Sequence, residues 1–328
     1  MSKYEIGKEF KMLQGMKLPA NPKLLPAANA LLEKMHGRSD SEVNVHTVQI
    51  PGYEGELITI YIMEPKHISG TVPCLIDYHG GGFMMKGSPA HFSRAKEYAY
   101  RLKCKVIFPD YRLIPEHPYP VPAEDCYETY KWVIENAEEL KIDVNRIAVI
   151  GDSAGGNLAM ATILMARDRK LPVPCFQILL YPVLDRRMET ESMKKYTDTP
   201  VWDARLTKLM WELYLQKSPD AFTGKGNNET PQAVSANAEW NLELIRYISP
   251  AEVQELSGIP HTYIEIAEFD CLCDEGLAFG GRLMAAGIPV EVHRIEGAVH
   301  GYDVLLKSDT VKKLMRRRVT LLKEAFGK

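Results

Sequence analysis

The stretch that decides the fold is Arg146-Ile147-Ala148-Val149-Ile150-Gly151-Asp152-Ser153-Ala154-Gly155-Gly156-Asn157. An apolar run typical of a buried strand ends at Ile150, and a helical pattern begins at Asn157. Between them lies a G-x-S-x-G pentapeptide centred on Ser153. A strand, a sharp turn and a helix in this order are the context of a nucleophile elbow, where glycines let neighbouring backbone approach closely and the hydroxyl stays exposed. An ordinary Gly-rich turn is the alternative, but this context favours Ser153 as a nucleophile.

Short apolar strands alternate with helical segments on both sides of this stretch. Two strands with an antiparallel hairpin pattern, Val43–Ile50 and Glu56–Met63, come first. Buried strands that alternate with helices predict an α/β fold with a mostly parallel central sheet and helices on both faces. The predicted strands are Val72–Tyr78, Lys105–Pro109, Arg146–Ile150, Cys175–Leu180, His261–Ala267 and Val290–Arg294, and the predicted helices are Phe92–Leu102, Ala123–Leu140, Asn157–Arg167, Glu275–Ala286 and Ser308–Phe326.

Two regions interrupt the alternation in the chain of 328 residues. Residues 1–42 carry two short helical patterns, one of which starts near Asn21-Pro22, a capping residue followed by a first-turn proline. Residues 185–257 hold a helical pattern over Asp203–Gln216 and a loop-like tract over Lys217–Glu239. Insertions of this length in an α/β sheet are often functional lids.

The composition excludes several classes of function. Charged residues make up 25% and hydrophobic residues 45% of the chain, with a net charge of −3, which is typical of a globular domain. The basic block Lys312–Arg318 lies in a helical pattern and is better explained as a solvated helix face than as a nucleic-acid site. No apolar run is long enough to span a membrane.

The six cysteines indicate a reducing compartment. They lie mostly in or beside apolar segments and form no C-x-x-C pair, so we expect a cytoplasmic protein in which cysteine acts as a small hydrophobe. The charged segment Met1–Phe10 has no signal-peptide core. Cys271 and Cys273 are the only close pair and lack further ligands at suitable spacing, so no metal is expected.

His79-Gly80-Gly81-Gly82-Phe83 follows the first parallel strand directly. Three consecutive glycines leave the backbone unshielded, so their N–H groups can point at one oxygen, as in an oxyanion loop. The N–H of Ala154, next to the nucleophile, is the expected partner donor. A phosphate loop is the alternative, but Lys86 precedes Gly87 where a P-loop lysine follows its glycine.

A serine nucleophile needs a base and an orienting acid, in the chain order serine, acid, histidine for this arrangement. His261 and His293 lie in predicted strands, whereas His300 follows one, so His300 is the predicted base and His293 a half-buried strand residue. Asp270 follows the C-terminal end of another strand, His261–Ala267, and is the predicted acid, with Glu268 as second choice. Asp274 and Glu275 begin the next helix, where a role at the helix N-terminus explains them.

These residues together resemble the hormone-sensitive-lipase-like esterases of the α/β-hydrolase fold. The resemblance implies an esterase for short to medium acyl chains, without a cofactor. It also implies a Ser153, Asp270 and His300 triad and oxyanion donors from Gly81, Gly82 and Ala154. The further segments that carry the resemblance are Tyr111–Pro120, Asp143–Ile147, Leu180–Pro182, Asp270–Gly276, Arg282-Leu283 and Ala286-Gly287.

The resemblance also implies a helical cap made by residues 1–42 and about 185–215, with 257 as its farthest end. Because the triad residues must converge, residues 1–328 are predicted to form one domain. The sequence departs from the family where Cys271 and Cys273 replace a proline and a basic residue, and where Tyr302 replaces phenylalanine. The residues expected to line the substrate site are Phe83, Met84, Trp202, Leu206 and Met210.

The sequence therefore predicts a serine carboxylesterase that acts on a small acyl ester, without nucleic-acid partners. Two alternatives stay open at this point. The first is a binding protein of the same fold that has lost catalysis, and the second is an amidase or peptidase with the same triad. The closing helix Ser308–Phe326 and the last strand are candidate contacts of a homodimer.

Overall fold

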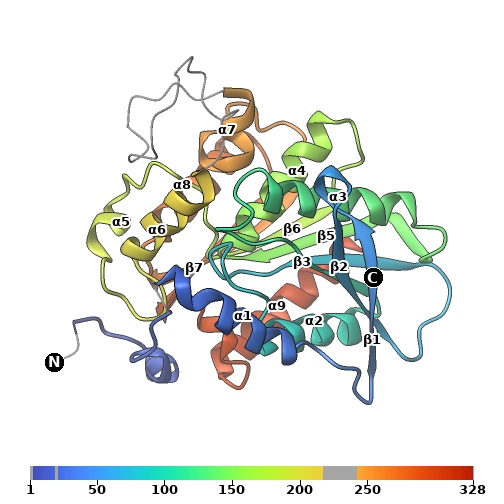
Figure 1. The fold of residues 1–328 in the computed structure, drawn as a ribbon, viewed down its shortest axis with the longest axis horizontal. Coiled ribbons are helices and arrows are strands. Elements are labelled where there is room, and N and C mark those ends of the chain that lie inside the picture. The colour runs from blue at the N-terminus through green and yellow to red at the C-terminus, as the bar shows by residue number, and fades with distance from the viewer. Residues whose placement is uncertain (1–2, 19–20, 217–241, 328) are drawn as a thin grey trace.

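A twisted eight-stranded sheet organises the computed structural model, which describes residues 3–18, 21–216 and 242–327 (Figure 1). The predicted loop Lys217–Glu239 lies outside the described residues. The strand order is β1-β2-β4-β3-β5-β6-β7-β8; β1, β2 and β4 pair antiparallel, and the remaining pairs are parallel. The strands are β1 Val43–Pro51, β2 Leu57–Pro65, β3 Val72–Tyr78, β4 Lys105–Asp110, β5 Ile142–Asp152, β6 Phe176–Leu180, β7 His261–Phe269 and β8 Val290–Val299.

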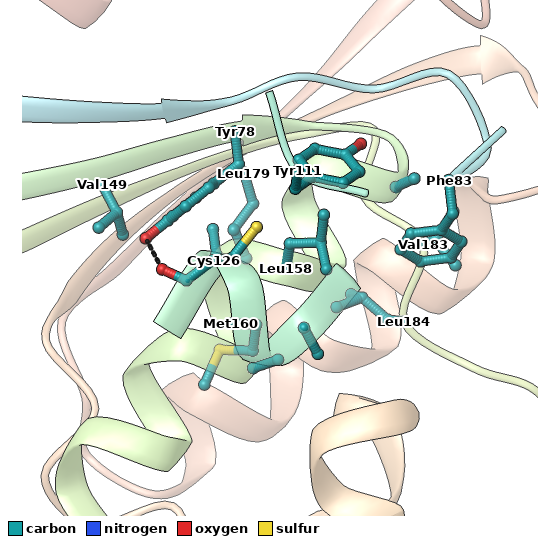
Figure 2. Close-up of a cluster of buried hydrophobic side chains, with 14 of the residues drawn as sticks. Tyr78, Phe83, Tyr111, Cys126, Val149, Leu158, Met160, Leu179, Val183 and Leu184 are labelled. Atoms are coloured by element: carbon teal, nitrogen blue, oxygen red, sulfur yellow. Dashed lines mark hydrogen bonds between the residues drawn. The ribbon is translucent and has the colours of Figure 1, made fainter. Parts of the chain in front are cut away.

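Helices cover both faces of this sheet, as the sequence predicts. Alternate strand residues face opposite layers: Leu75 belongs to the core under α2 and α9, and Ile76 to the core under α3, α4 and α8. The second core includes Tyr78, whose hydroxyl donates to the carbonyl of Cys126, 3.2 Å away (Figure 2). The helices packed on the sheet are α2 Pro89–Leu102, α3 Val121–Glu135, α4 Ala154–Asp168, α8 Cys273–Ala285 and α9 Asp309–Ala325.

Several predicted boundaries were wrong, and three of them illustrate the causes. The helix predicted to reach Leu140 ends at Glu135, because the Asn136 side chain donates to the carbonyl of Trp132 and competes with the helical pattern. The helix predicted from Phe92 begins at Pro89, where Ser88 and His91 form a capping box. The last strand continues beyond Arg294 to Val299 through an irregular register.

Residues 3–18 lie beside residues 185–216 (Figure 1). The Val201 N–H donates to the carbonyl of Met16 at 2.8 Å, and Lys17 forms a parallel bridge with Val201. The predicted helix over Asp203–Gln216 is observed with Asp203 as its cap. The elements of the N-terminal segment and the long insertion include η1 Lys8–Leu13, η2 Pro22–Leu24, α1 Leu25–Lys34, α5 Glu191–Lys195, α6 Ala204–Leu215 and α7 Leu242–Ile248.

No helix in the described ranges is long and apolar enough to cross a membrane. Within the same ranges, no group of three or more His, Cys, Asp or Glu side chains is arranged to hold a metal ion.

Candidate active site

Ser153 occupies a sharp turn between β5 and α4. Its backbone has φ 53° and ψ −119°, a left-handed conformation that costs a side-chain-bearing residue free energy and is typical of functional turns. Gly155 allows the turn to press against the end of β3, since a Cβ there would lie 1.9 Å from the carbonyl oxygen of Tyr78. The glycine therefore fixes the serine beside the loop that follows β3.

Ser153, His300 and Asp270 form one hydrogen-bonded row, although they come from the ends of three different strands. The His300 Nε2 lies 2.8 Å from the Ser153 Oγ, and its Nδ1 lies 2.6 Å from an Asp270 carboxylate oxygen. All three side chains are buried. The carboxylate can fix the histidine tautomer so that Nε2 is free to accept the serine proton.

The other candidate carboxylates bond elsewhere. Glu268, the second choice for the acid, accepts from the Gly297 N–H at 2.7 Å and pairs with Arg294. Asp274 and Glu275 lie in the first turn of α8, as predicted, but they accept from the backbone N–H groups of Ser192 and Leu184. These two side chains therefore anchor the segment after β6 to α8.

The loop after β3 turns its backbone through left-handed conformations, with φ 117° at Gly81 and φ 63° at Gly82. The N–H groups of Gly81, Gly82 and Ala154 donate no hydrogen bond inside the ranges that the structure describes. Ala154 is the first residue of α4, where N–H groups lack an intrahelical acceptor. These three donors are therefore available to an oxygen placed beside Ser153.

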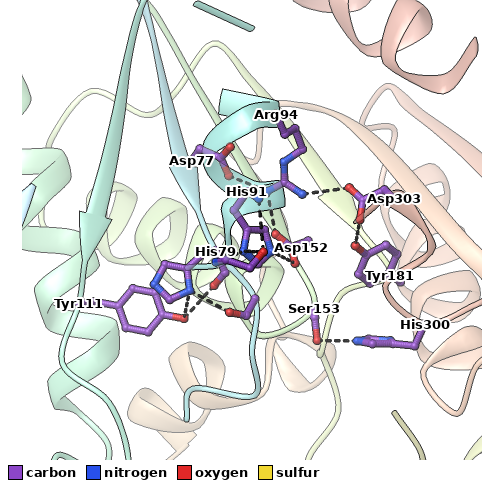
Figure 3. A network of polar contacts seen from close by, with 12 residues as sticks. Asp77, His79, His91, Arg94, Tyr111, Asp152, Ser153, Tyr181, His300 and Asp303 are labelled. Carbon is purple, nitrogen blue, oxygen red and sulfur yellow. Dashed lines mark hydrogen bonds and ion pairs between the residues drawn. The ribbon is translucent and has the colours of Figure 1, made fainter. Parts of the chain in front are cut away.

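His79 supports this loop by hydrogen bonding and ring stacking. Its Nδ1 donates to the carbonyl of Gly80 at 2.8 Å, and its ring stacks on Tyr111 with centroids 4.4 Å apart (Figure 3). The Tyr111 hydroxyl in turn donates to the carbonyl of His79. Burial lowers the pKa of His79 to about 4, so the ring is neutral near pH 7.

The model of the family described as alpha/beta hydrolase fold matches residues 75–304, which include all three residues of the row. The chain belongs to the hormone-sensitive-lipase-like family of α/β-hydrolases. The chain is 33% identical to Esterase LipI of Mycobacterium tuberculosis over 262 residues, which cover 80% of this chain and 75% of that protein. It is 29% identical to an arylesterase of Saccharolobus solfataricus over 80% of this chain and 76% of that one.

Among solved structures, this α/β-hydrolase is similar to one titled Bacterial Heroin Esterase. The TM-score is 0.83 at 33% identity, and the match covers 98% of each chain. Family membership and these similar proteins establish the class of reaction: the protein is a carboxylic ester hydrolase.

The hydrolase buries all five side chains expected to line the substrate site. Trp202 lies beside the row, with its ring centroid 5.9 Å from that of His300. Phe83 stacks face to face on Tyr214 of α6, with centroids 4.1 Å apart. Met84 approaches Gly82, while Leu206 and Met210 lie on α6 within the core that Trp202 also joins.

Two residues at the site, Asn29 and Tyr181, were not assigned a role from the sequence. Asn29 of α1 donates to the carbonyl of Met84 at 2.8 Å and accepts from the Lys86 N–H at 3.0 Å. The Tyr181 ring packs edge-on against His300, with centroids 4.8 Å apart. Asn29 lies in an unremarkable helical pattern, so no sequence signal marks it; Tyr181 lies in a segment that carried the resemblance and was assigned no role.

Proposed function

We propose that the protein is a serine carboxylesterase that hydrolyses short- to medium-chain acyl esters through an acyl-enzyme on Ser153. The observation that carries the proposal is the unbroken row Asp270, His300, Ser153, with hydrogen-bond distances of 2.6 Å and 2.8 Å. In a binding protein that had lost catalysis, no function would depend on the hydrogen bonds that align these three buried side chains.

In the proposed mechanism, the Ser153 Oγ attacks the ester carbonyl carbon while His300 Nε2 takes the hydroxyl proton. Asp270 holds the tautomer and stabilises the imidazolium. The N–H groups of Gly81, Gly82 and Ala154 stabilise the negative oxygen of the tetrahedral intermediate. His300 then gives the proton to the departing alcohol, and a water molecule, deprotonated by His300, releases the carboxylic acid and restores the serine.

The proposed cap consists of residues 1–42 and about 185–215, built onto a single domain. Its support is the bridge between Lys17 and Val201 and the placement of Trp202, a residue of the insertion, beside His300. We infer that this cap selects the substrate, with Phe83, Met84, Trp202, Leu206 and Met210 forming the apolar lining of the acyl site.

The test is hydrolysis of p-nitrophenyl esters from acetyl to decanoyl by the wild type and by Ser153→Ala. The proposal expects turnover that falls with the longest chains and is lost in the variant by several orders of magnitude. Unchanged turnover in Ser153→Ala would overturn the nucleophile, and wild-type activity confined to amides would overturn the ester preference.

The acid is tested by a matched pair of neighbouring substitutions. Asp270→Asn should lower kcat by up to about 10⁴-fold because it favours the wrong histidine tautomer. Glu268→Gln keeps an acceptor for the Gly297 N–H and should change kcat less than about threefold. The reverse order of effects would transfer the role to Glu268.

A further inference from the structure

Arg94 is a fully buried arginine on α2 that contacts three buried carboxylates at once. Its Nη1 lies 2.9 Å from an Asp303 oxygen, and its Nη2 lies 2.9 Å from Asp77 and 2.7 Å from Asp152 (Figure 3). The side chain is 2% exposed. A single guanidinium can do this because its donors form a rigid planar fork.

Each of the three carboxylates lies within three residues of a different part of the proposed active site: the glycine loop, the Ser153 turn and the His300 loop. Asp77 is two residues before His79 and the glycine loop, Asp152 immediately precedes Ser153, and Asp303 is three residues after His300. The loops follow β3, β5 and β8, so no two of them are joined by local sequence. The arginine comes from α2, a helix that contributes no residue to the hydrogen-bonded row.

We propose that Arg94 is a positioning residue of the hydrolysis, which holds the oxyanion loop, the nucleophile turn and the histidine loop in register through Asp77, Asp152 and Asp303. This inference rests on the proposed triad. Arg94 reaches no reacting atom; it acts on the distance and angle between Ser153 Oγ and His300 Nε2, to which the proton transfer is sensitive.

The neighbours of the three carboxylates extend the same restraint. Asp303 also accepts from the hydroxyl of Tyr181, whose ring packs on His300. Asp152 accepts from His91 Nε2 at 3.2 Å, and the His91 Nδ1 accepts from the Ser88 N–H, which fixes the tautomer. Burial alone would raise the pKa of the Asp152 carboxyl, but His91 and Arg94 outweigh it and hold that pKa far below its usual range. The carboxylate beside the nucleophile therefore stays charged and bound to Arg94.

Arg318 is the second buried arginine of this region, but its place differs. It pairs with Glu265 inside β7 and reaches Asp303 only at 3.5 Å. It supports the histidine loop from one side, whereas Arg94 spans all three loops. A lysine at position 94 carries the charge without the fork, so it cannot meet the three carboxylates with the same geometry.

The test is Arg94→Lys, assayed as kcat and KM per active site, with the sites counted by titration with diethyl p-nitrophenyl phosphate. We expect kcat per titrated site to fall about 10- to 100-fold, as for a reacting group misplaced by about 1 Å, with KM changed less than about threefold. The matched control is Arg112→Lys, because Arg112 binds Asp125 and the carbonyl of Tyr53 away from the row. The control should lower Tm and leave kcat per site unchanged.

A structural role alone would lower Tm or the number of titrated sites in Arg94→Lys and leave kcat per site within twofold of wild type, which would overturn the inference. If Arg94→Lys does not fold, Asp77→Asn replaces it, with Asp125→Asn as its control. Asp77→Asn should lower kcat per site severalfold while its control does not, and equal values in the two would also overturn the inference. A wild type that does not titrate at Ser153 would instead refute the proposed function.

Discussion

Gly82 and Trp202 are in direct contact beside the row formed by Ser153, His300 and Asp270. A Cβ on Gly82 would lie 2.5 Å from Cη2 of the Trp202 ring, and the same ring lies beside His300. The indole Nε1 donates to the Thr207 hydroxyl at 2.8 Å, which ties the ring to α6. The insertion therefore supplies a side chain that lies against both the glycine loop after β3 and His300.

Gly82→Ala should lower kcat by about 10²-fold. The new methyl group would displace Trp202 or the loop, and with the loop one oxyanion donor, whose loss typically costs 10²- to 10³-fold. The left-handed backbone at Gly82, with φ 63°, adds strain. Steady-state hydrolysis of p-nitrophenyl butyrate measures the effect.

Gly70→Ala is the matched control, because Gly70 has φ 72° and open space around its Cβ position. It should lose about 1–2 kcal/mol of unfolding free energy from the strained backbone and retain full kcat. Equal loss of kcat in the two variants would show that contact with Trp202 has no part in the effect.

Trp202→Ala should shift the acyl-length profile toward longer or bulkier chains. Removing a buried indole leaves a cavity beside His300, and an acyl chain can fill it in place of the ring. The ratio of kcat/KM for the octanoate and acetate esters should rise about tenfold. Trp132→Ala on α3 serves as control. If the octanoate-to-acetate ratio of kcat/KM changes equally in both variants, Trp202 does not line the acyl site.

Asn29→Ala should weaken the link between α1 and the oxyanion loop. The variant loses bonds to the Met84 carbonyl and the Lys86 N–H, at a cost of about 1–3 kcal/mol in the free energy of unfolding. Because Met84 follows the oxyanion loop, we also expect kcat to fall severalfold. Asn21→Ala removes only the cap of η2 and should cost about 1 kcal/mol with kcat retained. If Asn29→Ala lowers the free energy of unfolding but leaves kcat unchanged, the contact between α1 and the glycine loop does not contribute to catalysis.

Sequence periodicity predicted the sheet because buried strands and amphipathic helices are local patterns with distinct periods. It failed at Asn136 and Ser88, where a single side chain hydrogen-bonds to the backbone and moves a helix end. Periodicity also predicted that β8 ends at Arg294, whereas the strand continues to Val299. The pairing with β7 that extends it cannot be read from the sequence of either strand.

At the site, the chain order and the strand–turn–helix context nominated Ser153, Asp270 and His300, because those signals are local. Arg94 could not be found in this way. An arginine in a helical pattern is expected on a solvated face, and its buried role depends on Asp152 and Asp303, which lie 58 and 209 residues away. Long-range polar contacts of this kind leave no periodic trace.

The lowered pKa of His79 predicts that the free energy of unfolding decreases as the pH falls below about 6.5. The folded-state pKa of about 4 lies below the ordinary value of 6.5, so between these pH values the unfolded chain binds a proton that the folded chain does not. The contribution of His79 to stability is therefore complete above about pH 6.5 and is lost as the pH falls toward 4.

His79→Gln should flatten the decline of unfolding free energy between pH 6.5 and 4, because the glutamine amide can still donate to the Gly80 carbonyl but does not titrate. The difference between wild type and variant should change by on the order of 3 kcal/mol across this range. Urea unfolding at several pH values measures it, with His46→Gln, an exposed position on β1, as the control. Parallel curves for wild type and His79→Gln would mean that the proton uptake of acid unfolding occurs elsewhere, for example at the carboxylates around Arg94.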